Sequence, residues 1–232
     1  MAYVIPTPPV TALPVAGSGD TFPVRRVYCV GRNYAAHARE MGGDPTREPP
    51  FFFMKPADAL QAIPEGQTAD HPYPPKTQNY HFEVELVVAI AKGGRDIPVA
   101  EALDHVFGYA VGLDMTRRDL QDEAKQLRRP WELGKAADLS GPVGPLHPAA
   151  TLGHPAKGAI SLSVDGAVKQ KGDLSDMIWS VAEQIAYLSS YFEIAPGDVI
   201  FSGTPDGVGA VTQGQVMVAA IEGLGEMRLR VV

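Results

Sequence analysis

Hydrophobic residues along most of the chain alternate with polar ones or occur in short runs, the pattern typical of β-strands. The clearest alternation runs over residues 80–90, whose even positions are apolar throughout. The odd positions are polar as far as Glu85 and apolar afterwards, so this strand is predicted to enter the interior there. Further strands are predicted at 27–30, 51–54, 106–113, 160–168, 198–201, 216–220 and 227–231. An Asp-Gly pair at 165–166 predicts a hairpin turn.

Helical periodicity is confined to a few short segments, at 35–41, 116–127, 176–191 and a brief turn that begins near Ile97. The clearest amphipathic face lies within 176–191. With 24 Gly and 21 Pro, the chain also has many turn-forming residues. We therefore predict an α+β fold that is mostly strand. Residues 1–23 hold five prolines and are predicted as an N-terminal arm or cap before one domain at 24–232.

Composition narrows the class of protein without changing this picture. The 232 residues are 45% hydrophobic and 20% charged, which suits one globular domain with a full core. A net charge of −7, with no run of basic residues longer than a pair, excludes nucleic acid as an expected partner. No apolar run is long enough to cross a bilayer, and the first residues do not form a secretory signal. Cys29 is the only cysteine, so a reducing, cytoplasmic location is expected.

Three carboxylates form the first candidate site. Glu83 and Glu85 are two positions apart on one predicted strand, so both side chains point to one face, about 7 Å apart. Asp114, at the end of the predicted strand at 106–113, is the third carboxylate. The alternative for the two glutamates is the solvated face of an edge strand. The alternative for Asp114 is a helix cap, a role for which Thr116 competes. Like charges so close are costly unless a cation bridges them. Carboxylates without a Cys or His companion of clear spacing favour Mg²⁺, and His81 on the same face makes Mn²⁺ possible.

A second candidate pair lies on the predicted helix at 35–41. His37 and Glu40 are three positions apart and therefore share a helix face. A carboxylate that binds a histidine fixes its tautomer and raises its basicity, which produces a base that can activate water. An ordinary surface ion pair is the alternative interpretation.

Two further features are ambiguous by themselves. Lys135 follows an apolar stretch, which is typical of a surface lysine, but in a metal cleft its ammonium could stabilise an oxyanion. The glycine-rich loop at 202–209 lacks the residues of a P-loop and is first of all a turn. Its backbone N–H groups and Thr204 could also bind a carboxylate.

Six short motifs in sequence order together resemble the fumarylacetoacetate hydrolase family. They are GRNYAAHAREM (31–41), FMKP (53–56), HFEVEL (81–86), GLDMTRRDLQ (112–121), WELGK (131–135) and SGTP (202–205). The resemblance runs from about residue 22 to the C-terminus. Within the family, REPPFFF (47–53) and the C-terminal half look most like the bacterial fumarylpyruvate hydrolases of gentisate and salicylate degradation.

The resemblance implies a role for each matching position. The implied metal ligands are Glu83, Glu85 and Asp114, with Mg²⁺ as the expected ion and Mn²⁺ as a possible one. The implied catalytic residues are His37 and Glu40, carried on a lid helix, together with Lys135 and Gln121. The implied substrate-binding residues are Arg32, Lys55, Arg118 and Thr204. The family fold is a mixed β-sandwich roll with a few short helices, commonly in a homodimer.

The implied activity is hydrolysis of a carbon–carbon bond in a small diketo acid, with fumarylpyruvate as the expected substrate and fumarate and pyruvate as products. His37 and Glu40 would activate the water, and Lys135 and Gln121 would stabilise the oxyanion. The alternative on the same scaffold is an acylpyruvase, an oxaloacetate decarboxylase, or an isomerase/decarboxylase of hydroxymuconate-type acids. A small-molecule binding protein without catalysis is the alternative from another class.

The second carboxylate of fumarylpyruvate should meet a cation some distance beyond the metal. The motifs supply Arg118, Arg32 and Lys55 as candidates, with Arg128 and Arg129 at the following helix end as outsiders. The alternative is that these cations bind the pyruvyl carboxylate or pair with neighbouring acids.

Overall fold

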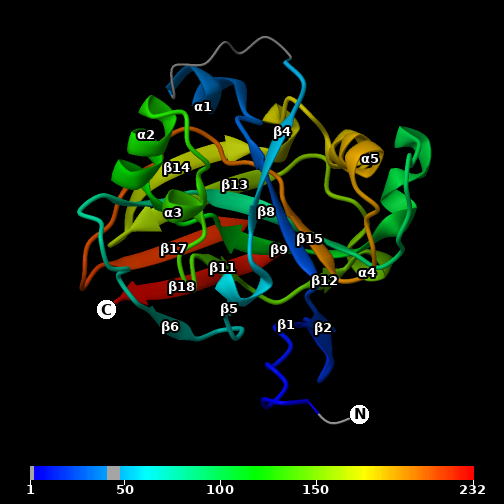
Figure 1. Ribbon diagram of the computed structural model, residues 1–232, viewed down its shortest axis with the longest axis horizontal. Coiled ribbons are helices and arrows are strands. Elements are labelled where there is room, and N and C mark those ends of the chain that lie inside the picture. Colours follow the sequence, from blue (N-terminus) through cyan, green and yellow to red (C-terminus); the bar gives the residue numbers. More distant parts are fainter. Residues whose placement is uncertain (1–2, 41–47) are drawn as a thin grey trace.

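The computed structural model describes residues 3–40 and 48–232, and its strands form two main sheets with short helices around them (Figure 1). The first strands are β1 (Ala12–Pro14), β2 (Thr21–Pro23), β3 (Arg26–Gly31), β4 (Phe51–Lys55), β5 (Leu60–Ala62), β6 (Thr68–His71), β7 (Tyr80–Phe82), β8 (Val84–Ile90) and β9 (Val106–Leu113). The others are β10 (Thr116–Arg117), β11 (Gly141–Val143), β12 (His147–Pro148), β13 (Ala159–Val164), β14 (Ala167–Asp173), β15 (Asp198–Phe201), β16 (Gly209–Ala210), β17 (Val216–Ile221) and β18 (Gly225–Val231).

The helices are short and lie outside the sheets. They are α1 (Ala35–Glu40), α2 (Arg118–Gln126), α3 (Glu132–Lys135), α4 (Ala149–Leu152) and α5 (Val181–Tyr191), with 3₁₀ turns at Ala57–Ala59, Val99–His105 and Leu174–Asp176. In Figure 1, α1, α2 and α3 lie toward the same end of the molecule, away from α4 and α5. None of the helices in the described residues is both long and apolar enough to span a membrane.

The larger sheet has the strand order β4-β3-β15-β8-β9-β11-β5, with β12 also paired to β9. The second sheet has the order β14-β13-β17-β18-β6. Parallel pairs (β15 with β3, β11 with β5, β18 with β6) occur among antiparallel ones, so both sheets are mixed. The predicted α+β, strand-dominated fold is confirmed.

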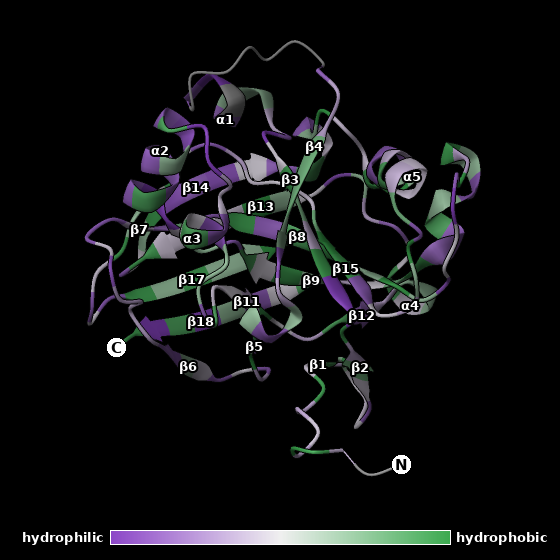
Figure 2. Cartoon of the chain, in the orientation of Figure 1, coloured by the Kyte–Doolittle hydropathy of each residue, from purple (hydrophilic) through white to green (hydrophobic). Residues whose placement is uncertain are grey.

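Strand β8 is central because both of its faces are buried. Its even positions, such as Leu86 and Val88, belong to a core that also contains residues of β13, β17 and β18. Its odd positions Val87 and Ala89 belong to a second core with residues of β3 and β15. Figure 2 shows hydrophobic residues along β8, β9 and β15, whereas α2 is mostly hydrophilic. The edge-strand interpretation of Glu83 and Glu85 is therefore wrong.

The predicted strand at 80–90 is divided at Glu83. Before this residue, β7 pairs with β10 and β16, and after it β8 pairs with β15 and β9. At the division, the Val84 N–H donates to Gln170 Oε1 (3.0 Å) and the Thr204 hydroxyl donates to the Val84 carbonyl (2.8 Å). Side chains thus satisfy backbone groups that a continuous ladder would have paired.

Local sequence signals predicted the hairpin turn correctly but not the first residues of two helices. Asp165 and Gly166 both have positive φ (50° and 82°) in the two-residue turn between β13 and β14, as the Asp-Gly signal predicted. The helix predicted from 176 begins only at Val181, because Ser180 caps it through a capping box with Glu183. The predicted helix at 116–127 begins at Arg118, without a side-chain cap, so the capping role given to Thr116 is wrong.

The N-terminal segment extends from the body in Figure 1. β1 and β2 pair with each other, and Leu13 and Phe22 are buried in the second core. The division of the chain at residue 23 stays a prediction. Met41 and residues 42–47, the end of the predicted first helix and its stop signal, lie outside the described residues.

Candidate active site

Three carboxylates meet where β8 begins and β9 ends. β8 and β9 are antiparallel, with Val84 opposite Leu113, so Glu83 and Glu85 lie beside Asp114, which directly follows β9. One oxygen from each carboxylate lies within 4.8 Å of the others. All three side chains are buried, with 4%, 2% and 1% of each residue exposed. The structure therefore brings together all three predicted metal ligands.

Two buried lysines neutralise much of this charge. Lys135 Nζ lies 2.9 Å from Glu83 Oε2 and 2.7 Å from Asp114 Oδ2. Burial opposes the charged form of Lys135, but Asp114 and Glu83 outweigh it and raise its pKa, so this lysine is protonated. Lys55 Nζ lies 2.9 Å from Asp114 Oδ1 and also donates to Ser140 Oγ (3.0 Å) and to the carbonyls of Met115 and Lys135.

Arg118 anchors the same cluster from the first turn of α2. Its Nη2 donates to Glu83 Oε1, its Nη1 to Gln121 Oε1 (2.6 Å) and its Nε to His81 Nδ1 (3.4 Å). His81 therefore supports Arg118 from behind, with its Nε2 bonded to Asn79 Oδ1 (2.8 Å). Burial alone would raise the pKa of Glu83, but the charges of Lys135 and Arg118 hold it below its usual range.

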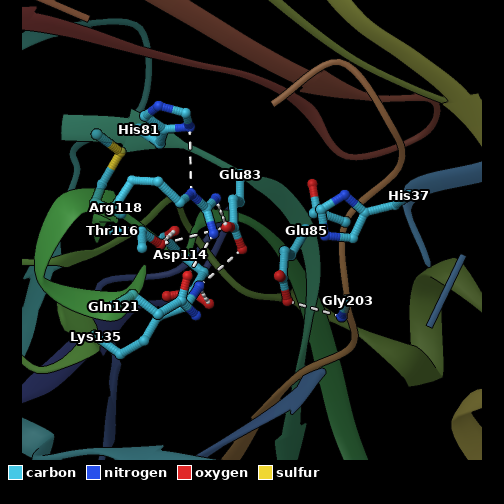
Figure 3. A network of polar contacts seen from close by, with 12 residues as sticks. His37, His81, Glu83, Glu85, Asp114, Thr116, Arg118, Gln121, Lys135 and Gly203 are labelled. Atoms are coloured by element: carbon cyan, nitrogen blue, oxygen red, sulfur yellow. Dashed lines mark hydrogen bonds and ion pairs between the residues drawn. The ribbon is translucent and has the colours of Figure 1, made fainter. Parts of the chain in front are cut away.

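Glu85 is the carboxylate without a cation of its own. Within the described part of the chain, the Gly203 N–H is its hydrogen-bond donor, at 2.8 Å from Oε2. Burial and the nearby charges of Asp114 and Glu83 raise its pKa well above the usual value. Figure 3 shows Glu85 and Gly203 on one side of Glu83, and Arg118, Gln121 and Lys135 on the other.

His37 and Glu40 form the predicted pair on α1. His37 Nδ1 lies 3.3 Å from Glu40 Oε2, and Glu40 also accepts the Gly207 N–H (3.2 Å). The His37 side chain is 7% exposed and the Glu40 side chain 36% exposed, so the pair reaches from the interior to the surface. Burial lowers the pKa of His37 below its ordinary value, although Glu83 and Glu40 act to raise it. His37 is therefore neutral at pH 7 and able to accept a proton.

The triad and His37 line one cavity that is partly open to solvent. Its lining includes the three carboxylates together with Val30, Gly31, Arg32, His37, Phe51, Phe53, Arg118, Gln121, Lys125, Trp131, Lys135 and Thr204. The cavity brings the predicted metal ligands, the histidine and most of the predicted substrate groups to one place.

Two predicted substrate-binding residues have other contacts. Lys55 is 1% exposed and packs behind Asp114 rather than lining the cavity. Thr204 lines the cavity, but its hydroxyl donates to the Val84 carbonyl and accepts from Gln170 Nε2 (2.9 Å). The loop at 202–209 uses two of its N–H groups on carboxylates of this chain, those of Glu85 and Glu40.

The carboxylate cluster fits a divalent cation. Three buried carboxylates provide the hard oxygen donors that Mg²⁺ and Mn²⁺ accept. Asp114 Oδ1 is buried and lies 2.9 Å from the Lys55 ammonium, so this oxygen is already ion-paired. Glu85, by contrast, is a buried carboxylate that has a raised pKa and no paired cation among residues 3–40 and 48–232, which is what removal of a cation would leave behind.

Comparison with known proteins agrees with this geometry. Residues 26–232 match the family profile described as fumarylacetoacetate (FAA) hydrolase, C-terminal. The chain belongs to the fumarylacetoacetate hydrolase family. The resemblance predicted from the six motifs is confirmed.

Relatives within the family carry different activities. A fumarylpyruvate hydrolase of Pseudomonas aeruginosa, solved in complex with Mn²⁺ and pyruvate, is 59% identical with a TM-score of 0.98, covering 100% of this chain and 99% of its own. A fumarylpyruvate hydrolase of a Ralstonia species is 42% identical over 81% of this chain and 95% of its own length. A mitochondrial oxaloacetate tautomerase of Arabidopsis thaliana is 42% identical over 89% of this chain and 90% of its own length.

Lys125 and the aromatic lining of the cavity were not predicted as site residues. Phe53 and Trp131 lie within two of the motifs, so their place in the sequence was a usable signal. Lys125 lay outside the motifs, but it is four residues after Gln121 and therefore on the same helix face.

Proposed function

We propose that this member of the family is a metal-dependent hydrolase that cleaves a carbon–carbon bond in a 2,4-diketo acid, with fumarylpyruvate as its substrate. The observation that carries this proposal is that the buried carboxylate triad and His37, which Glu40 contacts, line one cavity. The two fumarylpyruvate hydrolases among its relatives support the choice of substrate.

His37 is the proposed general base. When its Nδ1–H donates to Glu40, the neutral imidazole keeps its free lone pair on Nε2. Because burial lowers the pKa of His37, this nitrogen is unprotonated at neutral pH and can remove a proton from water. The activated water would attack the acyl carbonyl of the diketo acid, and the bond to the pyruvyl carbon would break.

Lys135 and Gln121 are the proposed stabilisers of the oxyanion. Both line the cavity, and Lys135 is held as a cation by Glu83 and Asp114. Arg118 donates to Gln121 Oε1, so the amide nitrogen of Gln121 is the donor left for a substrate oxygen. When bound at the triad, Mg²⁺ (or Mn²⁺) supplies charge stabilisation for the pyruvate enolate as it leaves.

The oxaloacetate tautomerase and decarboxylase among the relatives favour a second candidate function, enolisation or decarboxylation of oxaloacetate. These reactions use the same enolate but require no activated water. The His37–Glu40 pair, with its orienting carboxylate and its lowered His37 pKa, supports hydrolysis over this alternative.

The test is to incubate the purified protein with fumarylpyruvate and Mg²⁺ and to quantify the products. We expect fumarate and pyruvate in equal amounts, and loss of both when a chelator is present. Oxaloacetate is the parallel substrate. Faster formation of pyruvate from oxaloacetate, with no fumarate from fumarylpyruvate, would establish the second candidate instead.

We further propose that the protein acts in the cytoplasm as a homodimer. The single, buried Cys29 supports a reducing compartment, and the family resemblance supports the dimer. Light scattering of the purified protein tests the oligomeric state, with twice the chain mass expected.

A further inference from the structure

The proposed substrate ends in a second carboxylate that needs a partner away from the triad. Of the predicted candidates, Lys55 lies behind Asp114 and Arg118 donates from all three of its nitrogens to groups of this chain. Arg128 and Arg129 do not line the cavity among the described residues. Only Arg32 of the predicted cations is therefore placed to meet this carboxylate, and Lys125 joins it in the cavity lining.

We propose that Lys125 is a specificity-determining residue that binds the distal carboxylate of the acyl group, with Arg32 as the second cation. The proposal rests on the proposed function and deepens it. In this proposal, the Lys125 side chain makes the enzyme prefer diketo acids with a second carboxylate over those whose acyl group ends in a methyl.

Helix α2 places Lys125 at the correct end of the cavity. Arg118, Gln121 and Lys125 are at positions i, i+3 and i+7, so they form one row on the same helix face. Arg118 begins the row at Glu83, and Lys125 ends it two turns later, about 10 Å further along the helix axis. A diketo acid bound with its pyruvyl half at the triad would extend along this row.

An aromatic wall connects the two ends. Lys135 Nζ lies over the Phe53 ring (5.0 Å), and Phe53 packs against Trp131 with ring centroids 5.7 Å apart. Lys125 Nζ lies 5.6 Å from the centroid of the same Trp131 ring. A fumaryl group is flat and conjugated, so it suits an aromatic wall that ends in cations.

The second cation, Arg32, directly follows β3 and approaches the wall from there. Trp131 also contacts Phe51 edge-on, at 5.5 Å between centroids, and the Arg32 guanidinium lies 5.9 Å from the Phe51 centroid. Arg32 adopts a left-handed backbone conformation (φ 56°), which is uncommon for a residue with a side chain. The two cations thus flank the pair of rings at the end of the cavity.

The present partner of Lys125 is weak enough to be replaced. It is Asp122, at 3.4 Å, in an i, i+3 pair whose side chains are 28% and 49% exposed. Burial lowers the pKa of Lys125, and the nearby positive charges of Arg118 and Arg32 add to this effect. An incoming carboxylate would relieve that repulsion.

The charges around the cavity also favour a substrate with two carboxylates. At the triad, Glu83, Glu85 and Asp114 face an equal number of cations in Lys55, Lys135 and Arg118. Lys125 and Arg32 add two further positive charges to the cavity lining, outside this balanced set. A distal carboxylate would compensate part of this charge, whereas an acyl group that ends in a methyl would not.

The experiment compares kcat/KM for fumarylpyruvate and acetylpyruvate at saturating Mg²⁺ in the wild type, Lys125→Gln and Lys125→Arg. Acetylpyruvate carries the same pyruvyl half but no distal carboxylate. For Lys125→Gln, we expect the preference for fumarylpyruvate to fall by about ten- to hundredfold, mainly through a higher KM for that substrate. Lys125→Arg retains the charge and should keep most of the preference.

Arg129→Gln is the matched control. Arg129 is near the same helix end, pairs weakly with Glu123 (4.0 Å) and does not line the described cavity. Arg129→Gln removes one positive charge, as Lys125→Gln does, but outside the cavity lining. The preference of Arg129→Gln for fumarylpyruvate should therefore stay within about twofold of the wild type. Thermal melting of each variant shows whether it is folded.

The outcomes separate this inference from the proposed function. If the wild type prefers fumarylpyruvate and Lys125→Gln keeps that preference, the assignment of Lys125 is wrong while the proposed function stands. The assignment is also wrong if Lys125→Gln lowers kcat/KM equally for both substrates, since the residue then acts at the shared pyruvyl half. If the wild type uses acetylpyruvate but not fumarylpyruvate, both the proposed substrate and the role of Lys125 are contradicted.

Discussion

Glu83, Glu85 and Asp114 lie beside paired strands of the larger sheet, whereas His37 and Glu40 lie on a helix of six residues near the surface. Glu83 and Asp114 are held by a buried network of Lys55, Lys135 and Arg118, and Glu85 accepts the Gly203 N–H. Among the described residues, His37 is held by its contact to Glu40, which in turn accepts the Gly207 N–H. The difference indicates that the metal end is built into the core, while the base depends on a few replaceable contacts.

Both regions depend on the loop after β15. Gly203 donates to Glu85 and Gly207 donates to Glu40, so the loop segment 203–207 connects the carboxylate triad with the histidine pair. Asn33, two residues before α1, donates to the carbonyls of Ser202 (2.8 Å) and Trp179 (2.9 Å). The position of α1 therefore depends on the same loop that contacts the metal end.

The largest expected effect is at the metal end, in Glu85→Gln. The wild type should gain about 2.7 kcal/mol of unfolding free energy from Mg²⁺ at a hundredfold excess over its dissociation constant. The variant should lose both this gain and the hydrolysis, because it removes a carboxylate ligand. Thermal or denaturant unfolding with and without Mg²⁺ measures the shift. A wild type that is indifferent to Mg²⁺ and to chelator would contradict the assignment.

The next largest effect is at the histidine. His37→Ala should lower kcat by about 10²- to 10⁴-fold, because the general base is lost. Stabilisation by Mg²⁺ should be retained, which separates the two regions. His147→Ala, at a histidine outside the cavity lining, is the control. Hydrolysis of fumarylpyruvate by His37→Ala at the wild-type rate would show that the pair is an ordinary ion pair.

A smaller effect is expected where the loop holds Glu40. Gly207 has φ 86°, and a Cβ there would lie 2.2 Å from the Lys169 carbonyl oxygen. Gly207→Ala should displace the N–H that Glu40 accepts and lower kcat by about tenfold. Gly214→Ala is the control, because Gly214 has a similar φ of 90° but no atom within 4 Å of an added Cβ. This variant therefore introduces the backbone strain without the steric clash. Equal kcat values for the two variants would exclude a role for this contact.

The smallest effect is on the pH dependence of the metal-free protein. The pKa of Glu85 is raised in the folded state, so its contribution to stability is present below the unfolded pKa and is lost as pH rises through the folded pKa. Unfolding in chelator should therefore show stability that falls as the pH rises above the ordinary glutamate pKa of about 4.3. Glu85→Gln removes the titrating group and should lessen this slope. An equal slope in the variant would contradict the raised pKa.

Much of the site could be predicted because the strands follow simple periodicity. The alternation at 80–90 placed Glu83 and Glu85 on one face, and the order of six motifs supplied the partners. The division of that strand at Glu83 could not be predicted, because the choice between two sheets depends on partners far along the chain, including Gln170. The contacts of Thr116 could not be predicted either. Its hydroxyl donates to the Asp114 carbonyl (3.0 Å) and does not cap α2.

The positions of lysine side chains were the hardest to predict, because these long side chains reach many partners. Lys55 lies in a motif that predicts contact with substrate, and the fold places its ammonium beside Asp114, outside the cavity lining. Lys125 carries no motif signal and lies on a polar helix, yet it lines the cavity. Distinguishing the two required the positions of α2 and β4 relative to the triad.

The most direct test of the central claim is a crystal grown with Mn²⁺ and oxalate, an analogue of the pyruvate enolate, and measured for the anomalous signal of manganese. We expect one strong peak among the carboxylates of Glu83, Glu85 and Asp114, with oxalate bound to it and facing His37. A peak elsewhere, or none in the presence of excess Mn²⁺, would contradict a metal-dependent reaction at this site.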